Sequence, residues 1–278
     1  MDFLKILNLI EDRDPEMSER LNTRRQALRD FADLGKKLTA AAVPIAVGSM
    51  FQKAYGQSTA SVVDVLNYAL TLEYLEYRFY EKALATSGLI PAGAPTAAIT
   101  TIMNHEKAHV AFLTQAITGA GGMPVAEPKF DFSGGKGSGA GPFKDAFSNY
   151  PFFLAVAQSL EDTGVRAYKG QAPNLVKQNT VLTAALNIHS VEARHAAHIR
   201  QMRRANGATT LKPWITGKDS GVDNALVQAI YDGEENITQG GVNITTLGSI
   251  SNNAATEAFD EPLTKEQVLA VAGLFLAS

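Results

Sequence analysis

One arrangement of glutamate, tyrosine and histidine residues occurs twice in this chain and limits what it can fold into. In the first copy, Tyr80 follows seven residues after Glu73, and Glu106-Lys-Ala-His109 comes later. In the second copy, Tyr168 follows seven residues after Glu161, and Glu192-Ala-Arg-His195 comes later. The two glutamates of a copy are 33 residues apart in the first and 31 in the second. This correspondence indicates an internal repeat.

Each copy covers two amphipathic helices. Apolar residues recur every three or four positions from Val62 to Leu84, which predicts a helix that ends before Gly88. The same spacing predicts further helices from Pro95 to Gly119, from about 149 to beyond 168, and from about 180 to 206. The repeated glutamates, tyrosines and histidines fall on the apolar faces, near the middle of these helices.

The segment 119–142, between the second and third helices, is rich in glycine and proline. It fits a flexible linker between two domains, and it fits equally well a long crossover between two helical hairpins of one bundle. The two helices that follow favour the crossover. We therefore predict an all-α fold with a four-helix bundle over 58–207, a separate N-terminal segment over 1–57, and a less regular segment over 208–278 that packs on the bundle.

Composition excludes several kinds of site and partner. The net charge is −3 and no long basic run is present, which argues against a nucleic-acid partner. The chain has no cysteine, so any metal ion must be held by nitrogen and oxygen atoms.

Four glutamates that face one bundle core would repel one another in a medium of low dielectric. A pair of divalent metal ions removes this conflict, because carboxylates offset the metal charge and imidazoles complete the ligand set. A Glu-x-x-His motif places both side chains on one helix face. One Glu from each of two helices and Glu-x-x-His from each of the other two is a known ligand set of dimetal bundles, and it suits iron or manganese better than structural zinc. The predicted ligands are Glu73, Glu106, His109, Glu161, Glu192 and His195.

The alternative is a bundle without metal, in which the carboxylates form a buried hydrogen-bonded network. Under either interpretation Tyr80 and Tyr168 are core aromatic residues that donate hydrogen bonds to carboxylates, or redox-active groups. Glu76 lies one turn from Glu73, and Gly164 occupies the matching position of the second copy. We predict that Glu76 is a surface group or contacts the ligands, although it could replace Glu73.

The positions of the remaining histidines on the helices indicate different surroundings. His189, one turn before Glu192, is a candidate for contact with the ligands. We expect His105 and His198 to be ordinary helix-face residues, and Arg194 to be solvated.

Residues 58–207 resemble the ferritin-like superfamily, which includes proteins with a Tyr seven residues after the Glu of the first helix. The motifs ALTLEYLEYRFY and AFDEPLTKEQVLAVAG and the N-terminal segment resemble more particularly a bacterial branch related to plant desiccation-related proteins. The resemblance implies a four-helix bundle with a dinuclear iron or manganese centre. It implies no settled reaction for that branch.

Residues 23–56 resemble a twin-arginine export signal. Thr23-Arg24-Arg25 precedes an apolar run over 38–51 that is shorter than the roughly 20 residues of a membrane span. Ala54-Tyr55-Gly56 then matches a small-x-small cleavage site. We predict export to the periplasm or the cell exterior, and the alternative is a cytoplasmic protein that retains this arm.

Two classes of function follow from these expectations. In the first, the metal pair reacts with dioxygen or peroxide, and the protein is a ferroxidase, a peroxide scavenger or another oxidoreductase. In the second, the bundle is a structural or stress-protective protein that does not catalyse a reaction. We expect no stable membrane span, and either class is compatible with a homo-oligomer.

Overall fold

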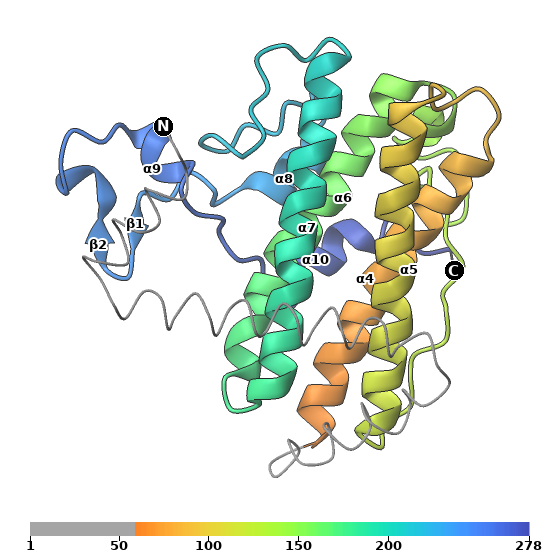
Figure 1. Cartoon of the computed structure of the whole chain (residues 1–278), viewed down its shortest axis with the longest axis horizontal. Helices are drawn as coiled ribbons and strands as arrows, with labels where there is room; N and C mark the ends of the chain where they lie inside the picture. The colour runs from red at the N-terminus through yellow and green to blue at the C-terminus, as the bar shows by residue number, and fades with distance from the viewer. Residues whose placement is uncertain (1–58, 278) are drawn as a thin grey trace, which may run out of the picture.

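The computed structural model describes residues 59–277. Four long helices form an antiparallel bundle of two hairpins (Figure 1). They are α4 (Thr59–Ala85), α5 (Ala94–Gly119), α6 (Tyr150–Gln171) and α7 (Asn179–Ala205). α4 packs with α5 and α6 with α7, while contacts of α4 with α6 and of α5 with α7 close the bundle. The predicted all-α bundle is confirmed, and its helices begin and end close to the expected residues. The predicted export signal and N-terminal arm lie outside the described residues.

Local sequence signals explain where these helices begin. The side chain of Asn149 accepts a hydrogen bond of 3.0 Å from the backbone N–H of Phe152 and caps α6. Proline occupies the first turns of α5 and α6, where its missing N–H costs no helical hydrogen bond.

The remaining elements are short and lie on or beside the bundle. The 3₁₀ helices are η1 (Lys144–Phe147), η2 (Ala172–Leu175) and η3 (Ile244–Thr246). The C-terminal segment contains α8 (Ala225–Tyr231), α9 (Asn252–Thr256) and α10 (Lys265–Ala272). Strands β1 (Thr238–Gln239) and β2 (Val242–Asn243) form an antiparallel hairpin beside α9, away from the four long helices (Figure 1).

The connection between α5 and α6 is a crossover whose backbone is hydrogen-bonded to the end of the C-terminal segment. Phe130 and Leu276 form an antiparallel bridge. The backbone N–H of Asp131 donates to the carbonyl of Phe275 over 2.7 Å, and that of Ala277 donates to the carbonyl of Lys129 over 2.9 Å. This glycine-rich segment therefore follows a defined path between the two hairpins.

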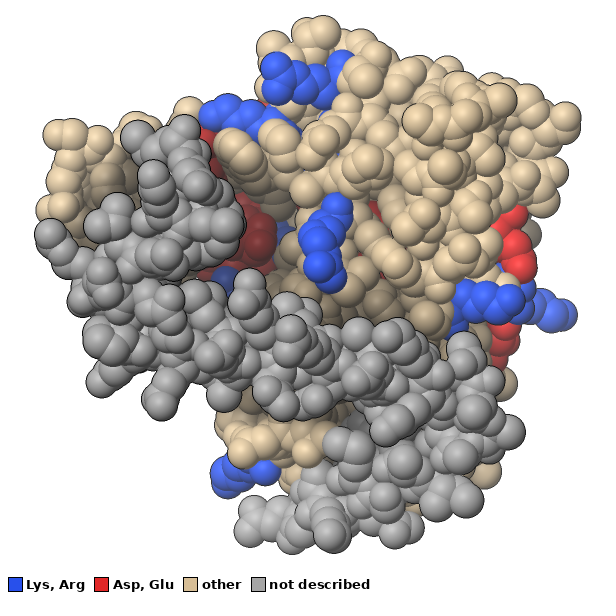
Figure 2. All heavy atoms as spheres, in the orientation of Figure 1, with Lys and Arg blue, Asp and Glu red and all other residues tan. Residues whose placement is uncertain are grey.

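The C-terminal segment leaves a cavity of about 170 Å³ against the outer faces of α6 and α7. Its polar lining includes Asp162, Arg200, Glu257 and Asp260. Figure 2 shows acidic side chains recessed in a hollow between α7 and this segment.

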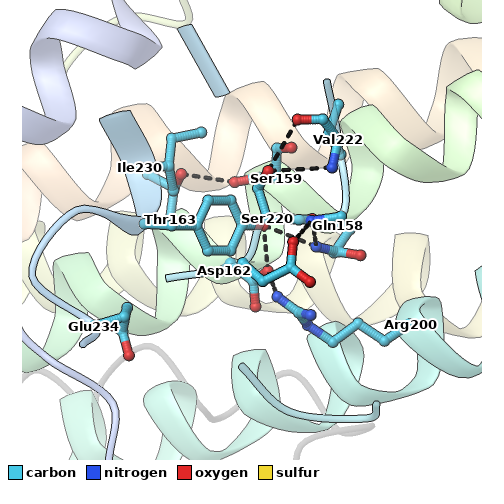
Figure 3. A network of polar contacts seen from close by, with 12 residues as sticks. Gln158, Ser159, Asp162, Thr163, Arg200, Ser220, Val222, Ile230 and Glu234 are labelled. Atoms are coloured by element: carbon cyan, nitrogen blue, oxygen red, sulfur yellow. Dashed lines mark hydrogen bonds and ion pairs between the residues drawn. The ribbon is translucent and has the colours of Figure 1, made fainter. Parts of the chain in front are cut away.

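A buried polar network fixes the same segment to the bundle (Figure 3). Asp162 of α6 accepts hydrogen bonds from Arg200 of α7 and from the hydroxyl of Tyr231 in α8. The amide of Gln158 donates to the carbonyl of Ser220 over 3.0 Å. The segment is therefore held by specific polar contacts as well as by apolar packing.

Two apolar clusters fill the bundle on either side of its middle. One contains aromatic residues such as Phe79, Phe132 and Phe153. The other contains aliphatic residues such as Leu66, Leu113 and Ile188. The repeated acidic and histidine residues lie between these clusters along the helices. Within residues 59–277, no helix has both the length and the apolar character needed to cross a membrane.

Candidate metal centre

The middle of the bundle contains six buried residues, each with at most 9 % of its surface exposed. They come from all four long helices and are Glu73 of α4, Glu106 and His109 of α5, Glu161 of α6, and Glu192 and His195 of α7. These are the six residues predicted as metal ligands. Their helical spacing explains the convergence, because each lies on the inward face of its helix.

The six residues form two overlapping groups of four. One group is Glu73, Glu106, His109 and Glu192, and the other is Glu106, Glu161, Glu192 and His195. In each group one ligand atom from every residue lies within 4.8 Å of the others. Glu106 and Glu192 belong to both groups, whereas each histidine and each remaining glutamate belongs to one. Two metal positions that share two carboxylates would have this composition.

Both histidines direct Nδ1 at carboxylate oxygens. Nδ1 of His109 lies 2.9 Å from Glu106 Oε2, 3.1 Å from Glu73 Oε2 and 3.4 Å from Glu192 Oε1. Nδ1 of His195 lies 2.7 Å from Glu106 Oε1 and 3.2 Å from Glu161 Oε2. The same ring nitrogen is therefore available for metal coordination in both copies of the repeat.

The two repeated tyrosines each contact a glutamate of the other hairpin. The hydroxyl of Tyr80 in α4 donates to Glu161 Oε1 over 2.5 Å. The hydroxyl of Tyr168 in α6 donates to Glu73 Oε1. These reciprocal bonds occupy one oxygen of each unshared glutamate and orient the other towards the histidines.

Several polar atoms of the cluster are buried without a hydrogen-bonding partner. These atoms are both carboxylate oxygens of Glu192, Glu106 Oε1, Glu161 Oε2 and His195 Nδ1. The 2.7 Å approach of Glu106 Oε1 to His195 Nδ1 is an ion-pair distance without hydrogen-bond geometry. Buried charged groups whose hydrogen bonds are incomplete cost several kcal/mol. All five atoms belong to predicted ligands and are oxygen or imidazole nitrogen, the donors that iron and manganese accept. The residues therefore fit a pair of such ions.

Burial and mutual charge perturb the titration of this cluster. Burial raises the pKa of Glu106 to about 7, despite the opposing effect of His109 and His195. Burial, together with the negative charge of Glu106, raises the pKa of Glu192 well above its ordinary value. Burial opposes the charge of His195, but the carboxylates of Glu161 and Glu106 outweigh it and raise the pKa of His195 to about 11. Without a bound cation, the cluster must therefore hold protons.

Glu76 is a fifth carboxylate directed at this cluster. It is 3 % exposed, which excludes the predicted surface position. Burial and the charge of Glu192 raise the pKa of Glu76 well above its ordinary value. The matching position in the second hairpin is Gly164, where a Cβ atom would lie 2.6 Å from Glu192 Oε2 and 3.2 Å from Glu76 Oε1. The missing side chain of Gly164 therefore provides space for both carboxylates, a role that sequence reasoning missed.

The other histidines differ in their relation to the cluster. His189 contacts the carbonyl oxygen of Val165 through Nδ1 at 2.9 Å, so its ring faces the backbone of α6. His198 and Arg194 are exposed. His105 was expected to be an ordinary helix-face residue, and this was wrong, because its Nδ1 lies 2.9 Å from Nε2 of His195. The sequence feature that could have indicated this contact is the position of His105 next to Glu106. Spacing within one helix, however, does not show which residues of another helix lie opposite.

Comparison with known proteins gives one match. The sequence model of the ferritin-like domain matches residues 61–205, which is just over half of the chain and covers all four long helices. No curated protein and no solved structure gives a significant match.

Proposed function

Because this chain belongs to the ferritin-like domain family, we propose that its buried Glu and His cluster binds two divalent metal ions. Glu73 and His109 would hold one ion, Glu161 and His195 the other, and Glu106 and Glu192 would be shared. Four carboxylates balance the charge of two divalent ions. Iron is the first candidate because of the donor set, and manganese is the second. The observation that carries this proposal is that both oxygens of Glu192, a residue common to the two groups, are buried without a hydrogen-bonding partner.

The proposed reaction is oxidation–reduction with dioxygen or peroxide. When bound, a pair of iron or manganese ions supplies the redox chemistry. The chain's own residues hold the site in place and exclude water. Tyr80 and Tyr168 fix the orientation of the unshared glutamates, and the apolar clusters on both sides separate the centre from solvent.

A metal-binding measurement tests the first part of this proposal. We expect protein from its native source to contain two ions per chain by elemental analysis. The Glu106→Ala/His195→Ala variant should lose tight binding, because one shared carboxylate and one imidazole are removed. The matched control is His198→Ala, which removes an exposed histidine of the same helix. A full metal complement in the double variant would contradict the ligand assignment.

A turnover measurement tests the second part. An enzyme should oxidise ferrous ion or consume peroxide through many cycles when a reductant is supplied. The competing function, a structural or desiccation-protective bundle, predicts at most one stoichiometric event. The hydrogen bonds from His109 to Glu73 and Glu106 favour this second function, because they stabilise part of the cluster without metal.

We also propose export, which rests on the sequence of residues 23–56. Intact-mass measurement on protein from its own host tests it. Cleavage near Gly56 predicts a mass lower than that of the full chain by residues 1–56. A mass equal to the 29.7 kDa of the full chain would mean that the arm is retained.

A further inference from the structure

The two ring nitrogens of His195 have different neighbours. Nδ1 faces inward, towards Glu106 Oε1 at 2.7 Å and Glu161 Oε2 at 3.2 Å. Nε2 faces His105, whose Nδ1 is 2.9 Å away. The two rings meet edge to edge in nearly one plane, with centroids 5.2 Å apart and planes inclined by 11°. His105 is itself exposed, so it lies between the buried ring of His195 and the surface.

This geometry restricts the positions of the hydrogens. An imidazole that binds metal through Nδ1 must have a free electron pair there and carries its hydrogen on Nε2. The Nε2–H group of His195 then requires an acceptor, and Nδ1 of His105 is at hydrogen-bonding distance. His105 in turn carries its own hydrogen on Nε2. Partners of this kind fix both the tautomer and the ring orientation of a metal-binding histidine.

We propose that His105 is a positioning residue of the dimetal centre, accepting the hydrogen bond from Nε2 of His195 that presents Nδ1 to the metal. This inference rests on the proposed function.

The repeat gives His109 no equivalent partner. Aligning Glu106 with Glu192 places His105 opposite Val191, whose side chain cannot accept a hydrogen bond. The contacts of His109 with Glu73 and Glu106 are made by Nδ1, whereas His195 also contacts His105 through Nε2. The two metal positions are consequently inequivalent, and the position that contains His195 is the tighter one.

Calorimetric titration of the metal-free full chain with Co²⁺ tests this inequivalence. We expect two binding steps in the unmodified protein. His105→Val should weaken the tighter step about 10- to 100-fold and leave the weaker step unchanged. His105→Asn should retain the affinity, because Asn Oδ1 occupies the place of the histidine Nδ1. Val191→His should tighten the weaker step, and His198→Val should change neither.

A second measurement does not depend on metal. The hydrogen bond should produce a ¹⁵N–¹⁵N coupling between His195 Nε2 and His105 Nδ1 in NMR spectra of the metal-free protein. Its absence, or equal weakening of both Co²⁺ steps by His105→Val, would overturn the role of His105 while leaving the dimetal centre intact. An unmodified protein that shows the coupling but binds no Co²⁺, iron or manganese would overturn the proposed function, and the positioning role with it.

Discussion

Single residues determine how the candidate centre is built. The spacing of Glu and His along each helix predicted which side chains would meet, because the inward face of a helix can be read from its period. The contacts of His105 and Gly164 could not be predicted from the helical period. Both depend on which residues of a neighbouring helix lie opposite them, and this is set by how the two hairpins pack.

Gly164 is the residue whose replacement tests the space available to the shared carboxylate. In Gly164→Ala, the new Cβ atom would lie 2.6 Å from Glu192 Oε2, so the carboxylate must move. We expect a loss of affinity for both metal ions, since Glu192 belongs to both groups. Alanine itself favours the helix by about 1 kcal/mol, so helix content measured by circular dichroism should not fall. Unchanged metal affinity would mean that Glu192 can shift without leaving the site.

At the scale of elements, the four long helices were predictable because each has its own amphipathic pattern, and proline marks the first turns of α5 and α6. The path of the crossover was not, since it is fixed by backbone pairing with residues far away in the sequence, as between Phe130 and Leu276. The way in which the C-terminal segment attaches to the bundle could not be predicted from the sequence either. It depends on buried arginines of α6 and α7, such as Arg166 and Arg203, which donate hydrogen bonds to backbone carbonyls of that segment.

Arg166 links α6 to three residues in two parts of the C-terminal segment. Its Nε lies 2.7 Å from the carbonyl of Glu261 and 2.8 Å from Glu234 Oε1, and its Nη2 donates to the carbonyl of Asp232 over 3.0 Å. In Arg166→Met, Glu234 would remain buried without an opposite charge and keep only the hydrogen bond from the Glu261 N–H, so we expect a loss of about 3–5 kcal/mol in the free energy of unfolding. Urea denaturation of the metal-free protein measures this loss.

The matched variants separate the ion pair from general packing. Arg166→Met/Glu234→Met should recover part of the lost stability, because no buried charge is left alone. Arg194→Met, at an exposed arginine, should change the free energy of unfolding by less than about 0.5 kcal/mol. A loss below about 1 kcal/mol in Arg166→Met would mean that solvent reaches Glu234.

The stability of the whole molecule should depend on pH differently with and without metal. In the metal-free protein, Glu106 titrates near pH 7 instead of 4.5 and His195 near 11 instead of 6.5. The folded state therefore keeps protons that the unfolded chain releases, and its stability falls as pH rises from about 4.5 through 7 and onward towards 11. Metal ions replace these protons, so they stabilise the folded state more strongly at higher pH.

Thermal unfolding at several pH values measures this response. The melting temperature of the metal-free protein should fall from pH 5 to pH 8, and the gain from added iron or manganese should widen over the same range. Glu106→Gln should flatten the dependence of the metal-free protein, whereas Glu266→Gln, at an exposed carboxylate, should not. A melting temperature that depends neither on pH nor on added metal would favour the hydrogen-bonded bundle without metal.

The bridge between Phe130 and Leu276 also sets an order of events during synthesis. Residue 276 leaves the ribosome 146 residues after residue 130, and by then all four long helices have been translated. The hairpins can assemble early, because their contacts join neighbouring segments and local contacts form fast. The crossover between them reaches its final path only when residues 274–277 are available for backbone pairing. A nascent chain stalled before residue 274 should therefore contain a formed bundle whose crossover is still cut readily by proteases.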